Sequence, residues 1–185
     1  MTRFLFIAIF CVMIFSCGND QNMKVDVSAK PFEWEKVYSH DSGFVAVLSK
    51  INTSNESEFI NSETGLFIIS SAGAIPGVQW MREPEGALPM DFSHVKEEEL
   101  PKVDCDSKSF WSKAGCYVQK VNQINESKIL ENCNLSKGEK EKAERASQAI
   151  IYSAINTELS IRYYFSLIGG RWYITFIDAR KPCQA

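Results

Sequence analysis

The chain has 185 residues, of which 45% are hydrophobic and 12% aromatic, and its formal net charge at pH 7 is −3. This composition supplies enough apolar side chains for a packed core, and the length suits one domain. The mild acidity argues against nucleic acid as a partner, because nucleic-acid binding favours a basic surface.

The N-terminal segment has the pattern of an export signal. One basic residue, Arg3, precedes the unbroken apolar run 4–15, which stops at Ser16. A short basic start, an apolar run of roughly 7–15 residues and a small residue at the cut are typical of a secretory signal peptide. The run is too short to span a membrane, which takes about 20 apolar residues. We therefore expect residues 1–16 to be removed as a signal peptide.

The end of this signal, Ile14-Phe15-Ser16-Cys17, resembles the lipobox of bacterial lipoproteins. In that family the cysteine becomes the first residue and its sulfur takes a diacylglycerol, so the resemblance implies Cys17 as the lipid attachment site, with palmitate among the acyl chains. Phe15 departs from the pattern, because a smaller residue is usual there. The alternative is a plain secretory signal with an incidental cysteine.

The segment that follows predicts a tether. Residues 18–30 are polar and lack apolar periodicity, which is typical of a flexible linker. The sequence thus predicts a lipidated tether at 17–30 and one α+β domain at 31–185. Localisation is expected to be the cell envelope, on a membrane, with the outer membrane slightly favoured because Gly18 is not an aspartate.

The first half of the domain offers short elements. Residues 44–51 fit the end of a helix that begins near Glu33, and they could instead form a strand after the turn-like residues 41–43. The other expected elements are a short helix at 55–60, a buried strand at 65–70, a loop-rich stretch at 71–115 and a strand at 115–121.

A longer helix is predicted at 137–155. Ser136 and Glu139 have the spacing of a capping box, which marks a helix N-terminus. Apolar residues recur behind it at helical spacing: Ala143, Ala146, Ile150 and Ala154. The charged residues between them predict a solvated face.

A β-hairpin is predicted to close the domain. Two segments rich in β-branched and aromatic residues, 157–168 and 171–180, flank Gly169-Gly170, which suits a type I′ turn. That turn predicts three cross-strand pairs, Leu167 with Trp172, Phe165 with Ile174, and Tyr163 with Phe176. These six residues and Ile161 would form the apolar face of a half-buried hairpin.

Four cysteines remain after Cys11 leaves with the signal and Cys17 is lipidated. They are Cys105, Cys116, Cys133 and Cys183. An even number in an exported protein predicts two disulfides with three possible connectivities, of which we favour Cys105–Cys116 and Cys133–Cys183. Zinc is the disfavoured alternative, because the spacing contains no Cys-x-x-Cys pair.

The order of elements resembles NTF2-like folds, which wrap a curved antiparallel sheet around helices in a cone. The helical start and the closing Gly-Gly-Arg-Trp hairpin carry the resemblance. A cystatin-like arrangement of a helix on a sheet would give a similar pattern. The mature chain also resembles exported bacterial lipoproteins. NTF2-like cones often hold a pocket at the open end, which implies a possible pocket at Trp80, Arg82, Tyr163 and Asp178.

The sequence contains no phosphate loop, dinucleotide fingerprint or nucleophile elbow. Core packing is the competing interpretation for Tyr163, and an ion pair with the C-terminal tail is the one for Asp178. The acidic residues around Asp104 and Asp106 predict a solvated loop rather than a cation site. We expect neither a cofactor nor a metal.

Two functional hypotheses remain. The favoured one is a non-enzymatic, lipid-anchored module that binds an envelope protein or a small ligand. The other is an NTF2-like envelope enzyme that uses Asp178 or another buried carboxylate as a general base.

Overall fold

The computed structural model describes residues 42–51, 56–71, 76–84, 92, 95–96, 99–124 and 128–183. All of them belong to the unit Phe32–Ala185. The predicted signal peptide, the tether and Cys17 lie outside the described residues. None of the described helices has both the length and the apolarity needed to cross a membrane.

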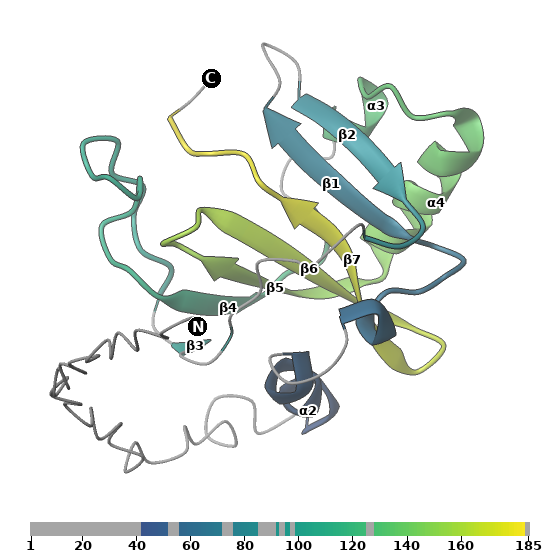
Figure 1. The fold of residues 1–185 in the computed structure, drawn as a ribbon, viewed down its shortest axis with the longest axis horizontal. Helices are drawn as coiled ribbons and strands as arrows, with labels where there is room; N and C mark the ends of the chain where they lie inside the picture. The colour runs from purple at the N-terminus through teal and green to yellow at the C-terminus, as the bar shows by residue number, and fades with distance from the viewer. Residues whose placement is uncertain are drawn as a thin grey trace, which may run out of the picture. The chain divides into compact units, whose positions relative to one another are not determined.

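A seven-stranded mixed sheet forms the centre of this unit (Figure 1). Its strands are β1 (Leu66–Ser71), β2 (Pro76–Met81), β3 (Val95–Lys96), β4 (Cys116–Lys120), β5 (Ile150–Asn156), β6 (Ile161–Ile168) and β7 (Arg171–Asp178). Their order is β2-β1-β7-β6-β5-β4-β3. The α+β class is as predicted. The expected antiparallel sheet is wrong, because β1 pairs in parallel with β7 and β3 with β4.

Helices cover both faces of this sheet. On one face, α2 (Ser42–Ile51) and the 3-10 helix η1 (Glu56–Phe59) share a buried cluster with β4, β5, β6 and β7. Phe44 of α2 is central there, with its ring stacked on Tyr152 at 4.2 Å between centroids. On the other face, α3 (Lys128–Glu131) and α4 (Lys137–Gln148) share a second cluster with Phe67, Tyr164 and Phe176. The sheet is therefore a central layer with apolar side chains on both sides.

The first half of the domain matches several expectations. Residues 44–51 belong to a helix rather than a strand, and the predicted short helix is the single 3-10 turn η1. The buried strand at 65–70 and the strand at 115–121 appear as β1 and β4. The loop-rich stretch is corrected in part, because it contains β2 and β3.

Helix α4 begins as predicted and ends earlier. The Ser136 hydroxyl accepts from the Glu139 backbone amide, and the Glu139 carboxylate accepts from the Ser136 amide at 2.8 Å. The helix stops at Gln148, and the predicted continuation to 155 is instead strand β5. Its sequence, Ile-Ile-Tyr-Ser-Ala-Ile, is rich in β-branched and aromatic residues, which favour a strand.

The closing hairpin has the predicted turn and a bulge that the prediction missed. The pairs Leu167–Trp172 and Phe165–Ile174 are confirmed, but Tyr163 pairs with Ile177. The register shifts between Tyr164 and Phe165, where Thr175 is the additional residue, and Phe176 therefore lies on the opposite face, beside Tyr164. The hairpin is consequently buried on both faces.

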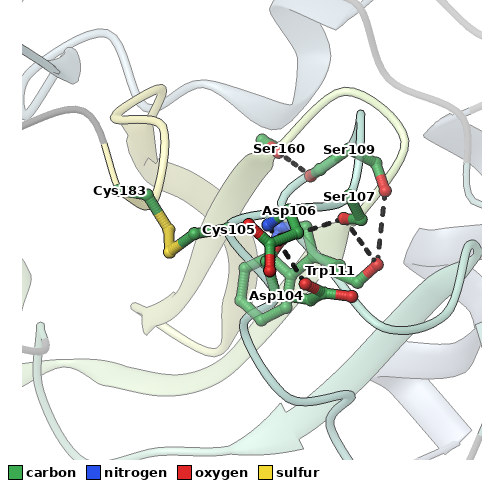
Figure 2. Close-up of a disulfide and its surroundings, with 8 residues drawn as sticks. All are labelled: Asp104, Cys105, Asp106, Ser107, Ser109, Trp111, Ser160 and Cys183. Carbon is green, nitrogen blue, oxygen red and sulfur yellow. Dashed lines mark hydrogen bonds between the residues drawn. A yellow bond between two sulfur atoms is a disulfide. The ribbon is translucent and has the colours of Figure 1, made fainter.

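The disulfide pairing also differs from the prediction. Cys105 is bonded to Cys183, across 78 residues of sequence (Figure 2). Cys116 and Cys133 are buried thiols in the clusters on opposite faces of the sheet, so the favoured pairs Cys105–Cys116 and Cys133–Cys183 are wrong. The disulfide therefore ties the loop before β4 to the tail after β7.

Candidate functional site

The structure separates the four predicted pocket residues. Trp80 and Arg82 lie at the end of β2. Tyr163 is fully buried in the cluster under α2, where its ring meets Phe92 edge to face. Asp178 ends β7, beside the start of the C-terminal tail. Only Trp80 and Arg82 therefore remain as neighbours around one surface feature.

A tight turn before β1 holds the indole of Trp80. The Asn61 side-chain oxygen accepts from the amides of Glu63 and Thr64, and Gly65 follows with φ +73°. The indole nitrogen of Trp80 donates to the Thr64 carbonyl at 2.8 Å. A Cβ at Gly65 would stand 2.3 Å from that nitrogen. Glycine is required here both by the left-handed conformation and by the approach of the ring.

Beside this turn lies an open depression of about 600 Å³. It is formed by the turn, by the residues that follow β2 and by one side of α4. Its lining residues are Ser62, Glu63, Arg82, Glu83, Lys142 and Arg145. The volume is within the usual range for small-ligand sites, about 300–1,000 Å³.

The lining of the depression carries one more cation than carboxylate. Arg82, Lys142 and Arg145 face two carboxylates, those of Glu63 and Glu83, which leaves a formal surplus of one positive charge. Among the described residues, no ion pair involves any of the three cations. The Lys142 ammonium instead lies 4.6 Å from the centre of the Trp80 ring. The lining thus presents three cationic groups beside two carboxylates.

Asp178 is held by the tail, as its competing interpretation predicted. Arg180 donates to both carboxylate oxygens, through Nε at 2.9 Å and through a terminal guanidinium nitrogen at 2.7 Å. The side chain of Asp178 is 11% exposed. This carboxylate is thus held in a bidentate ion pair by Arg180, the arrangement expected of a residue that fixes the tail.

The acidic loop near the disulfide is organised by its own hydrogen bonds (Figure 2). Asp104 accepts from the Asp106 amide, and the Ser107 hydroxyl donates to the Trp111 carbonyl. The Ser160 hydroxyl donates to the Ser109 carbonyl and so joins the loop to the turn before β6. Within the described ranges, no group of three or more His, Cys, Asp or Glu side chains is placed to hold a metal ion.

Sequence reasoning missed most of the depression. The sequence places Lys142 and Arg145 on a solvated face of the helix; Arg145 is exposed and Lys142 partly so, but nothing local indicates that this face borders β2. Their spacing of three residues, which puts both on one side of a helix, is the only available signal. The chain matches no protein-family model, and it shows no significant similarity to a curated protein or to a solved structure.

Proposed function

We propose that the chain is the precursor of a cell-envelope lipoprotein that is cut before Cys17 and anchored to a membrane by lipid on that cysteine. Of the two membranes, the outer one is slightly favoured. The apolar run, the lipobox-like Ile-Phe-Ser-Cys and the polar segment 18–30 support this proposal. Two acyl chains or more would make the anchor durable, whereas a single chain holds only marginally.

The exposed disulfide supports export. Cys105 and Cys183 are both exposed, and an accessible disulfide persists in an oxidising compartment rather than in a reducing cytosol. The bond joins the loop before β4 to the C-terminal tail, 78 residues apart in the sequence. If the chain is exported with its thiols reduced, the bond would form in the oxidising compartment once folding has brought the two cysteines together.

We further propose that the domain is a binding module and that the depression beside Trp80 is its binding site for a small ligand or an envelope protein. The observation that carries this proposal is the group of three cations that line one depression and form no ion pair with another described residue. The binding proposal is favoured over the enzymatic alternative because Arg180 holds Asp178, the named general base, in a bidentate ion pair with the tail.

We propose, as the finer description of the fold, a variant of the NTF2-like or cystatin-like cone. Helix α2 packed on the β4–β7 face and the closing hairpin support it. The parallel addition of β1 to β7 and the placement of α4 on the second face are departures from a simple cone.

The anchoring is tested by metabolic labelling with palmitate in a bacterial host that processes lipoproteins. The native chain should take up label and remain in the membrane fraction, whereas Cys17→Ser should take up none and lose its lipid-dependent retention. Cys11→Ser is the matched control, because it removes a cysteine from the signal itself. Equal labelling of native chain and Cys17→Ser would contradict the proposal.

A further inference from the structure

We propose that the depression beside Trp80 binds a phosphate group, carried by a small soluble molecule or by a lipid head group. The proposal deepens the proposed function, because it names the ligand class of the binding domain. It rests on the six residues of the lining and on the arrangement of the elements that bring them together.

The charges come from two separate elements and converge only in the folded domain. Arg82 follows β2, while Lys142 and Arg145 lie one helical turn apart on α4. Like charges gathered in one depression repel one another, and among the described residues none of the three cations is held in an ion pair. A bound anion would relieve it, and the loss of repulsion would contribute to affinity.

The donors of the lining suit a tetrahedral oxyanion. The two guanidinium groups offer planar forks that match phosphate oxygens, and Lys142 adds a compact charge. The Ser62 hydroxyl, from the turn before β1, is a fourth donor in the lining. Donors from several directions match the oxygens of a phosphate, which point in several directions, better than the two coplanar oxygens of a carboxylate.

The two carboxylates limit what kind of phosphate compound fits. Glu63 and Glu83 reduce the charge of the lining to a surplus of one. A polyanion such as nucleic acid gains affinity by neutralising many phosphates with many cations, which this lining cannot offer. A molecule with one phosphate group, and with a hydrogen-bond donor to face a carboxylate, matches the depression.

The experiment is an NMR titration of the purified full chain. The reporter is the indole N–H of Trp80, which donates to the Thr64 carbonyl beside the depression. The Lys142 ammonium lies over the same ring. A spectrum of the Trp80→Phe variant assigns the signal. The probes are inorganic phosphate, and dihexanoyl phosphatidylglycerol kept below its micelle concentration. Arg82→Gln/Arg145→Gln is compared with Lys102→Gln/Lys181→Gln, which removes the same charge from exposed positions outside the lining.

We expect saturable shifts of the Trp80 signal with at least one probe, weakened about tenfold or more in the arginine variant and less than about twofold in the lysine variant. Saturation by phosphate alone assigns the site to soluble phosphate compounds, and tighter saturation by the lipid assigns it to head groups. The proposal is overturned if neither probe saturates the native chain, or if both variants weaken binding equally. Lipidation of Cys17 is measured independently, so its failure is a separate result.

Discussion

The disulfide Cys105–Cys183 offers the sharpest test of the architecture. The perturbation is the double variant Cys105→Ser/Cys183→Ser. In the chain-entropy description, a disulfide that closes a loop of 78 residues lowers the conformational entropy of the unfolded chain, which corresponds to about 4.5 kcal/mol of stability at 25 °C. Measured losses for native disulfides are about 2–5 kcal/mol, so we expect the free energy of unfolding to fall by about 2–4.5 kcal/mol.

The assay is equilibrium unfolding in urea, followed by tryptophan fluorescence and circular dichroism. Reductant should destabilise the native chain by about the same amount, and it should leave the double variant unchanged. A loss below about 1 kcal/mol in the double variant would refute the entropic reasoning. A further loss on adding reductant to the double variant would show another disulfide, and would contradict the buried thiols of Cys116 and Cys133.

Two further substitutions probe the elements that border the depression. Gly65→Ala should lower the free energy of unfolding by about 1–3 kcal/mol and shift the Trp80 indole signal, because the added Cβ meets that ring and the backbone is left-handed there. Gly138→Ala is the control and should be neutral or stabilising, because nothing lies within 4 Å of an added Cβ. Equal losses of stability in the two variants would contradict this account. Ser136→Ala should cost about 1 kcal/mol by removing the cap of α4. Hydrogen bonds from Ser136, and to a smaller extent the charge of Lys142, hold the pKa of Glu139 below its usual value. The stability that this carboxylate contributes is therefore present above the usual glutamate pKa, and it is lost as the pH falls through the lowered pKa. Urea unfolding between pH 6 and pH 3 should show that loss in the native chain and a smaller one in Ser136→Ala, and identical pH profiles would contradict the capping box.

The features that sequence reasoning predicted correctly are local ones. The capping box needs only Ser136 and Glu139, three residues apart. The type I′ turn needs two residues with positive φ, and Gly169 and Gly170 have φ +59° and +76°. Each interaction lies within a few residues of sequence, so the residue types alone identify it.

The features that were missed depend on tertiary contacts. Ile150 and Ala154 continue the helical spacing of Ala143 and Ala146, but pairing with β4 and β6 makes residues 150–156 a strand. The bulge at Thr175 depends on its buried hydroxyl, 2.7 Å from that of Ser166, which in turn donates to the Ala146 carbonyl. No pattern within one strand reveals such a contact.

The candidate site shows the same division. The resemblance to a cone is the basis for predicting Trp80 and Arg82 as pocket residues; Arg82 lines the depression, and the Trp80 ring lies beside the lining residue Lys142. Tyr163 and Asp178 were grouped with them by analogy to a cone, and the structure places Tyr163 in the core instead. The cations of α4 join the site because that helix packs beside β2, which only the folded chain determines.

The most direct test of the central proposal is mass spectrometry of the intact protein extracted from the membranes of a lipoprotein-processing host. The account predicts a chain that begins at Cys17 and carries a diacylglyceryl group on its sulfur, with further acylation of the amino group permitted. A chain that retains residues 1–16, or that begins elsewhere with an unmodified Cys17, would contradict it.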